Sequence, residues 1–436
     1  MSDTLVPQIP VTPSVIGAEP VRRVPTDWTT QAMQSRIRRR YASERRFRFA
    51  GLAAVWLSAA FLAYLLVTMV MQGASGFVET RVSLPVDLAA AKLPIEPARL
   101  VGRGADLALA GAGLEGTVDL AATKAFGKDG TDLLSDGAWA VVRDAIKADP
   151  SLLQRKTVFE VPVSSPIDVA AKGNGTRDAE AIVARLKASG ALTRGFNAGF
   201  LTSADSTDAT RVGIWGAFKG SLLTMIVTLL LAFPIGVLSA LYLEEYAPKN
   251  RWTDLIEVSI NNLAAVPSII FGLLGLAVFL GTFGMPRSAP IVGGLTLALM
   301  TMPVIVIAGR NAIKAVPPSI RDAALGIGAS PVQVVFHHVL PLALPGILTG
   351  TIIGMARALG ETAPVLMIGM RAFIAAPPSG LSDPATVLPV QIFLWSDQVS
   401  RGFVEKTSAA IIVLLVFLLA MNGVAIYLRN RFETRW

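Results

Sequence analysis

The chain of 436 residues contains no cysteine and only two histidines, the adjacent pair His337 and His338. Without cysteine it can form neither a disulfide framework nor a thiolate metal site. Two neighbouring histidines are too few ligands for a histidine-based metal centre, and we interpret them as solvated loop residues. The sequence therefore predicts no metal site.

Charged residues are also scarce, and two catalytic motifs are missing. Only 16% of the residues are charged and 53% are hydrophobic, a composition typical of membrane proteins. The glycine-lysine pair Gly127-Lys128 lacks the flanking residues of a phosphate-binding loop, so ATP hydrolysis by that route is excluded. No G-x-S-x-G frame surrounds Ser221. We predict a protein without catalytic residues or a cofactor, which is not an enzyme.

Long apolar runs are what the sequence has instead. Each is long enough to cross about 30 Å of hydrocarbon as a helix. They cover residues 49–71, 220–243, 258–281, 290–309, 346–370 and 408–428. We therefore predict an α-helical polytopic membrane protein with six transmembrane helices. The first run is too long and too far from the N-terminus for a cleaved signal peptide, so it should remain as an anchor.

Arginines flank the first and last runs. The basic tail 1–48 includes RIRRRYASERRFR (36–48), and the chain ends in RNRFETRW (429–436). Basic residues beside apolar spans favour membrane orientation over nucleic-acid binding as the role of the net charge of +8. They predict a multi-pass protein of the inner membrane with both termini in the cytoplasm. Residues 1–35 lack periodicity and are interpreted as a mobile tail.

Residues 72–212 contain no run of spanning length. Apolar residues recur with helical spacing in 137–149 and 176–192, and they alternate as in a strand in 157–165. We predict an α+β domain inserted between the first two spans. Because the N-terminus should lie inside, this insert should be extracytoplasmic. The transmembrane domain proper is then 213–430.

Prolines and glycines recur within the spans. Pro234, Pro267 and Pro303 predict kinked or broken helices, which membranes tolerate where freed carbonyls meet protein or water. Glycines at 346, 350 and 354 should let two helices approach closely. Both features suit a transport pathway, and a compact bundle without a pathway remains the alternative.

The loop between the fourth and fifth runs, residues 315–345, has its own pattern. Ser319 is a candidate N-cap for a short helix that glycine ends. The segment RDAALGIGASPVQVVFHHVLPLALPGI (321–347) resembles the EAA loop of ABC-importer permeases, although aspartate replaces the usual glutamate and His338 replaces an aliphatic residue. The matching residues are Asp322, Ala323, Ala324, Gly328, Leu340 and Pro341. The resemblance implies a coupling helix that seats on an ATPase subunit.

Two further segments narrow the resemblance. Together with the loop, VPSIIFGLLGL (266–276) and ARALGETAP (356–364) are similar to phosphate-importer permeases of the PstA type. The likeness covers about 212–436, and the first 211 residues look like an extended N-terminal version. It implies import of inorganic phosphate with two ATP-binding subunits, a second permease of the PstC type and an extracytoplasmic phosphate-binding protein. The other partner is the lipid bilayer, and no nucleic acid is expected.

Arg357 and Glu361 are ionisable residues inside the fifth run. A charge near the bilayer centre costs about 2.5–3.5 kcal/mol, so both residues are candidates for function. Their i,i+4 spacing puts them on one helical face, with Arg357 about 16 Å along a helix that starts at Gly346. One interpretation is a neutralised pair that fastens helices. The other is an anion pathway, in which forked arginine donors bind phosphate and the carboxylate keeps binding weak enough for release.

Two other functions stay open. A different tetrahedral oxyanion, such as sulfate or molybdate, would suit an arginine equally well. A membrane-anchored phosphate sensor would also use residues 72–212 as a ligand-recognition domain. The EAA-like loop favours the transport subunit.

Overall fold

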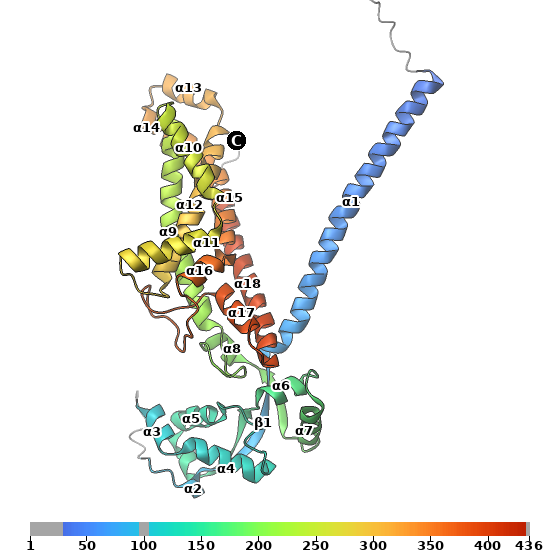
Figure 1. Cartoon of the computed structure of the whole chain (residues 1–436), viewed down its shortest axis with the longest axis vertical. Helices are drawn as coiled ribbons and strands as arrows, with labels where there is room; N and C mark the ends of the chain where they lie inside the picture. Colours follow the sequence, from blue (N-terminus) through green and yellow to red (C-terminus); the bar gives the residue numbers. More distant parts are fainter. Residues whose placement is uncertain (1–28, 96–103, 433–436) are drawn as a thin grey trace, which may run out of the picture. The chain divides into compact units, whose positions relative to one another are not determined.

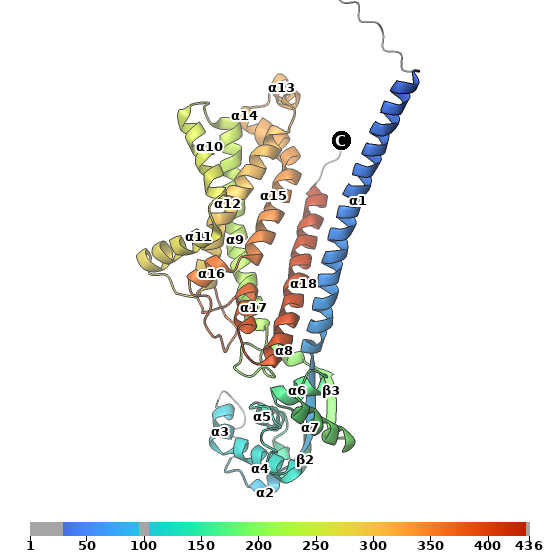
Figure 2. The same ribbon diagram turned by 45° about the vertical axis from the view of Figure 1, so that its right-hand side comes forward.

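The computed structural model describes residues 29–95 and 104–432, and most of these are helical (Figures 1 and 2). The predicted mobile tail therefore lies largely outside the described residues. The chain forms two compact units that meet within the first helix, between Leu66 and Val67. We describe each unit separately.

The first helix, α1, runs without a break over Gln31–Ala74. It contains both the arginine-rich segment and the first apolar run, because alanine, leucine and arginine are all good helix formers. The predicted span 49–71 is thus the C-terminal part of a longer helix.

Five described helices are long and apolar enough to cross a membrane, or six if a bent pair is one span. The five are Gln31–Phe77, Trp215–Tyr246, Pro290–Lys314, Pro331–Gly360 and Arg401–Arg431. The helical polytopic class is confirmed. The elements of these spans are α9 (Trp215–Leu241) with the π-helical turn η4 (Tyr242–Tyr246), α12 (Pro290–Lys314), α15 (Leu340–Gly360) and α18 (Arg401–Phe432).

The predicted span 258–281 is broken, and the break predicted at Pro267 is confirmed. This region forms α10 (Arg251–Ala264) and α11 (Ser268–Gly275), which is extended by the π-helical η5 (Leu276–Thr282), and the two halves bend by 100°. Pro267 occupies the N-cap of α11. A proline disfavours helical geometry in the residue before it, so the break falls at Val266 and Pro267.

Four membrane-spanning helices pack side by side, with α12 against α9 and α15, and α15 against α18 (Figures 1 and 2). The glycine ladder of α15 faces α12: a methyl group added at Gly346 would lie 2.7 Å from the Ala312 side chain, and one at Gly350 would overlap Ala308. The predicted close approach of two helices is confirmed. The segment 371–407 contains a further helix, α17 (Leu388–Ser396), which packs against α9 and α18.

The insert is built on a three-stranded antiparallel sheet with the order β2-β1-β3. Val82, Leu84 and Val86 alternate along β1 and bury one face of the sheet. The helices predicted in 137–149 and 176–192, and the strand in 157–165, are all present. The strands are β1 (Val78–Asp87), β2 (Lys156–Pro162) and β3 (Leu192–Phe196). The helices are α2 (Leu88–Ala91), α3 (Ala105–Gly111), α4 (Leu114–Phe126), α5 (Ala138–Ala148), α6 (Ser165–Ala171), α7 (Arg177–Ala188) and α8 (Ala198–Thr202).

Buried charges join the insert to the N-terminal end of α18. Lys172 lies 2.7 Å from Asp168 Oδ2 within the insert and 3.0 Å from Glu405 Oε2 on α18. The next residue, Lys406, donates a 2.8 Å hydrogen bond to the Gly76 carbonyl just before β1. All four charged side chains are almost fully buried, so the insert and this helix end form one packed structure.

Candidate functional site

The helix that carries the predicted site begins earlier and ends earlier than the apolar run 346–370. It starts at α14 (Pro331–Gln333), where Ser330 and Gln333 form a capping box, and continues through the π-helical η6 (Val334–Val339) into α15. Glu361 follows the last helical residue and has an extended backbone. Arg357 therefore lies in the last turn, and the prediction that both residues sit within one spanning helix is wrong.

The structure nevertheless brings Arg357 and Glu361 together. Arg357 Nε lies 3.3 Å from Glu361 Oε1, and their side chains are 52% and 19% exposed. Arg357 shares its exposed face of α15 with Ile353 and Gly360, at i−4 and i+3. Several guanidinium donors therefore stay open to a ligand or to another chain on this face.

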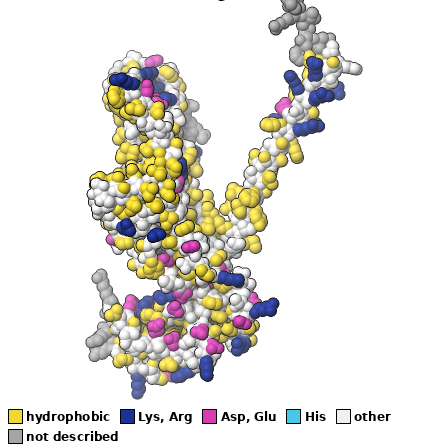
Figure 3. Space-filling model, in the orientation of Figure 1, with side chains coloured by type: hydrophobic (Ala, Val, Ile, Leu, Met, Phe, Trp, Pro, Cys, Tyr) yellow, Lys and Arg dark blue, Asp and Glu magenta, His cyan; other side chains and the backbone are white. Residues whose placement is uncertain are grey.

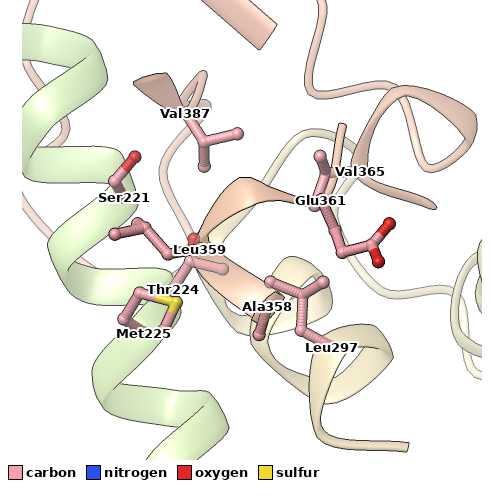
Figure 4. Close-up of a pocket in the computed structure, with 9 residues that line it drawn as sticks. All are labelled: Ser221, Thr224, Met225, Leu297, Ala358, Leu359, Glu361, Val365 and Val387. Atoms are coloured by element: carbon pink, nitrogen blue, oxygen red, sulfur yellow. The ribbon is translucent and has the colours of Figure 1, made fainter. Parts of the chain in front are cut away.

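Glu361 also borders a small cavity between α9, α12 and α15 (Figure 4). Its volume is about 10 Å³, which holds about one water molecule. A tetrahedral anion is larger, so this conformation is closed to such an ion. In Figure 4 the Glu361 carboxylate and Ser221 lie on opposite sides of the cavity. The lining residues are Ser221, Thr224, Met225, Leu297, Ala358, Leu359, Glu361, Val365 and Val387.

Sequence reasoning missed the polar side chains buried here. Thr224 is 1% exposed, and its hydroxyl has no hydrogen-bond partner among the described residues. The Thr386 hydroxyl and both side-chain amide atoms of Gln391 are also buried without a hydrogen-bond partner among the described residues. Ser221 Oγ, in contrast, accepts a 2.8 Å hydrogen bond from the Leu388 amide. A buried polar group without a partner costs about 1–3 kcal/mol, so such groups call for a functional explanation. Ser221, Thr224 and Thr228 repeat at helical spacing, which was the available signal.

The EAA-like loop forms the short helix α13 (Pro318–Gly326). Asp322 and Ala323 are exposed, whereas Ala324 is buried against the transmembrane domain. Ser319 is not the N-cap, because Pro317 takes that position and Pro318, with its fixed φ, starts the helix. Gly328 has a φ of +90°, so glycine is required just past the helix end as predicted.

The remaining predicted loop residues lie where the chain returns to the long helix. Leu340 is half-buried and Pro341 is exposed at the start of α15. His337 is exposed and His338 half-buried within the turn η6, so the interpretation of the pair as loop residues is wrong. The described residues include no group of three or more His, Cys, Asp or Glu that could hold a metal ion.

The surface of α13 and the turn after it is unusually apolar for an exposed loop. Leu325 is 50% exposed, Ile327 82% and Val332 55%. These side chains lie near the exposed carboxylate of Asp322 in the sequence. An exposed apolar patch with a polar edge is typical of a protein-docking surface.

A network of charges lies behind this surface. Glu244 in η4 pairs with Arg310 of α12 and, at 3.4 Å, with Lys314. Arg310 Nη2 also lies 2.7 Å from Glu257 Oε2 of α10. The adjacent Glu245 pairs with Arg321 of α13 at 2.7 Å. Three spans and the loop helix therefore meet in one cluster, which sequence reasoning did not predict.

Comparison with known proteins divides the chain into two matches. Residues 34–181 match a domain of unknown function, and residues 214–434 match the model of the binding-protein-dependent transport system inner membrane component. The second match contains α9 to α18, with Arg357, Glu361 and α13.

Two relatives identified by sequence agree with that match. A probable ABC transporter permease, YqgI of Bacillus subtilis, is 31% identical over 52% of this chain and 83% of its own length. A phosphate transport system permease, PstA 1 of Mycobacterium tuberculosis, is 36% identical over 36% of this chain, which covers about half (51%) of that relative. The inward-facing MetNI methionine ABC transporter has a TM-score of 0.40 at 18% identity, over 51% of this chain and 95% of its own.

Proposed function

Because the chain belongs to the family of binding-protein-dependent transport system inner membrane components, we propose that this ABC importer permease moves inorganic phosphate across the cytoplasmic membrane. Phosphate is supported by PstA relatives from Mycobacterium tuberculosis and Haemophilus influenzae, which are 36% and 29% identical. It is also supported by Arg357, whose open guanidinium offers forked donors to tetrahedral oxyanions.

ATP hydrolysis would come from a separate subunit that docks on α13. The exposed Asp322 and the apolar side chains of Leu325 and Ile327 support this proposal, because they form a surface suited to a groove on a partner. The complete importer would contain two such ATPase subunits, a second permease of the PstC type and an external phosphate-binding protein. The termini of this chain would lie in the cytoplasm and the insert outside.

The anion would pass along the side of α15 that carries Arg357. This face is open in the single chain, as expected if a second permease completes the pathway. Glu361 would weaken anion binding at Arg357 and so permit release. The closed cavity beside Glu361 would widen when the helices move, and the Thr224 hydroxyl would then meet the ion.

Uptake measurements test the substrate. The chain is co-produced with its permease and ATPase partners and reconstituted into vesicles with ATP inside and the phosphate-binding protein outside. ATP-dependent uptake of radiolabelled phosphate is then measured with sulfate and molybdate as competitors. We expect unlabelled phosphate to reduce this uptake, and sulfate and molybdate to leave it unchanged. Competition by sulfate or molybdate instead would assign another oxyanion, and phosphate binding without ATP-dependent uptake would assign a sensor.

A matched pair of variants tests the pathway. Thr224→Val keeps the shape of the side chain and removes a hydroxyl that has no partner among the described residues. The control is Thr228→Val, whose hydroxyl donates a 2.9 Å bond to the Thr224 carbonyl within α9. We expect the first variant to raise the KM for phosphate several-fold at unchanged assembly, and the second to leave KM unchanged. Equal KM values in the two variants would remove Thr224 from the pathway.

A further inference from the structure

The N-terminal part of α1 is a fully solvated cluster of arginines. All seven arginine side chains are exposed, and none forms an ion pair within the described ranges 29–95 and 104–432. Glu44 is the single acidic residue among residues 36–48. Figure 3 shows dark-blue side chains along this end of the helix and hydrophobic ones along the rest. The seven are Arg36, Arg38, Arg39, Arg40, Arg45, Arg46 and Arg48.

The unbroken helix fixes the distance of each arginine from the apolar run. Residues 49–71 extend about 35 Å at 1.5 Å per residue, which slightly exceeds the roughly 30 Å hydrocarbon layer. Arg48 directly precedes this run, and Arg45 lies within about 6 Å of its first residue along the axis. Phe47 and Phe49, which are both exposed, flank Arg48 at the start of the run. Arg45, Arg46 and Arg48 therefore lie at the depth of the lipid headgroups.

The depth of the arginines nearest the apolar run decides between a lipid and a protein partner. Arg45, Arg46 and Arg48 lie within one turn of the run and project over about 160° of the helix at about 100° per residue. At that depth lipid headgroups surround the helix, so their phosphate groups are within reach of all three side chains. We propose that Arg45, Arg46 and Arg48, the proximal arginines, bind the phosphate groups of anionic phospholipids.

Guanidinium groups bind phosphate oxygens through paired donors, so these contacts exceed a simple charge attraction. Each basic residue near an anionic surface favours association by about fivefold. The distal arginines, Arg36 to Arg40, lie about 14–20 Å from the apolar run. The headgroup layer extends about 5–7 Å beyond the hydrocarbon, so the distal arginines lie about 7–15 Å above it. This is close to or beyond the screening length of about 8 Å at physiological salt, so they contribute less to headgroup binding than the proximal three. This binding is independent of the transported substrate.

The test uses the full chain, because the absence of native cysteine allows one unique label. A fluorophore at Ser43→Cys serves as donor in phosphatidylcholine vesicles that contain headgroup-labelled phosphatidylglycerol, or headgroup-labelled phosphatidylcholine, as acceptor. The ratio of the two energy-transfer efficiencies reports local enrichment of the anionic lipid around α1. We expect enrichment of about fivefold or more in the parent chain at physiological salt.

Two charge-neutralising variants distinguish specific binding by the proximal arginines from non-specific attraction by the total positive charge. Arg45→Gln with Arg46→Gln and Arg48→Gln should lower the ratio to one, and replacement of the same three by lysine should preserve part of it. Replacement of the four distal arginines by glutamine removes more charge but should lower the ratio less than the triple variant does. The proposal would be overturned if the energy-transfer ratio decreased in proportion to the number of charges removed, or if it were one in the parent chain. A parent ratio of one with loss of a copurifying protein in the triple variant would assign the arginines to that protein instead.

Discussion

Arg321 on the loop helix α13 forms an ion pair with Glu245 of η4, which continues α9, with Nη2 2.7 Å from Oε1. The same guanidinium donates hydrogen bonds of 2.7 Å and 3.0 Å to the carbonyls of Val316 and Ile313, at the C-terminal end of α12. One side chain thus ties α13 to two membrane spans. A force applied to α13 must reach α9 and α12 unless these bonds break.

Removing that tie should uncouple the importer. In Arg321→Ala we expect the ratio of phosphate uptake to ATP hydrolysis in proteoliposomes to fall at least tenfold. Glu245 would lose its partner, and α13 would move independently of the spans. Arg321→Lys should recover part of the ratio, because lysine keeps the charge but cannot bond all three acceptors. Lys249→Ala, at an exposed position nearby in the chain, is the control. A normal ratio in Arg321→Ala would contradict transmission through this residue.

Gly328 should be intolerant of a side chain. Its φ of +90° costs another residue about 1–3 kcal/mol, although a Cβ there would meet no neighbour. Gly328→Val should therefore distort the turn after α13 and weaken copurification of the ATPase subunit, while membrane insertion is normal. Gly326→Ala is the matched control, because that glycine is helical and equally open. Equal ATPase recovery in both variants would show that the turn does not matter for docking.

The roles of Arg357 and Glu361 separate on charge reversal. Arg357→Gln and Glu361→Gln should each impair uptake in an assembled complex. In Arg357→Glu with Glu361→Arg, a fastening pair could re-form, since the two charged groups would still face each other. A pathway arginine would be displaced past the end of α15 and meet the anion at another depth. We expect uptake to stay abolished, and recovery to near the parent level would withdraw Arg357 from the pathway.

The contact of α12 with α15 can be tested by exchange of one methyl group. Gly350→Ala would place a Cβ in overlap with the Ala308 side chain, so we expect a lower unfolding temperature in detergent and loss of uptake. Ala308→Gly in the same chain removes the overlapping methyl group and should restore most of the lost stability and uptake. The recovery in stability should be incomplete by about 1 kcal/mol, because glycine within a helix is less stable than alanine. Failure of the second substitution to restore stability would mean that the two helices separate for another reason.

Single cysteines should report the proposed topology. Ser164 in the insert is a poor labelling site, because its hydroxyl oxygen is buried. Ala188, exposed at the end of α7, is better, and Lys249 is an exposed residue that the proposed topology places on the cytoplasmic side. With Ala188→Cys we expect reaction with an impermeant thiol reagent in intact spheroplasts, and with Lys249→Cys reaction only after lysis. The reverse pattern would invert the whole topology.

Apolar runs predicted where helices lie, but not how they bend. Pro234 and Pro303 lie inside the continuous helices α9 and α12, whereas Pro267 marks a 100° break. Proline alone therefore does not decide the outcome. At the break, Gly272 of α11 packs so closely on Pro364 that a Cβ would lie 2.6 Å from its Cα, a long-range contact that no local pattern reveals. The bend depends on tertiary packing.

The candidate site was predicted only in part, because local sequence patterns do not reveal tertiary packing. Arg357 and Glu361 were found because charges in an apolar run are unusual, and their pairing is confirmed. The helix end at Gly360 was not found, because the run stays apolar beyond it. Thr224 escaped notice because a threonine in a span usually bonds to its own helix. Only the three-dimensional structure identifies the hydroxyl that lacks such a bond.

The buried contacts of Glu405 and Lys406 on α18 with the insert limit which substitutions this chain can accept during evolution. Glu405 and Lys406 are almost fully buried where they contact Lys172 and the Gly76 carbonyl of the insert. Breaking a buried ion pair by removing one partner costs about 3–5 kcal/mol, so loss of the charge at Lys172 or Glu405 alone should be strongly destabilising. The two positions are therefore expected to change together. Homologues with an uncharged residue at one position should have an uncharged residue at the other.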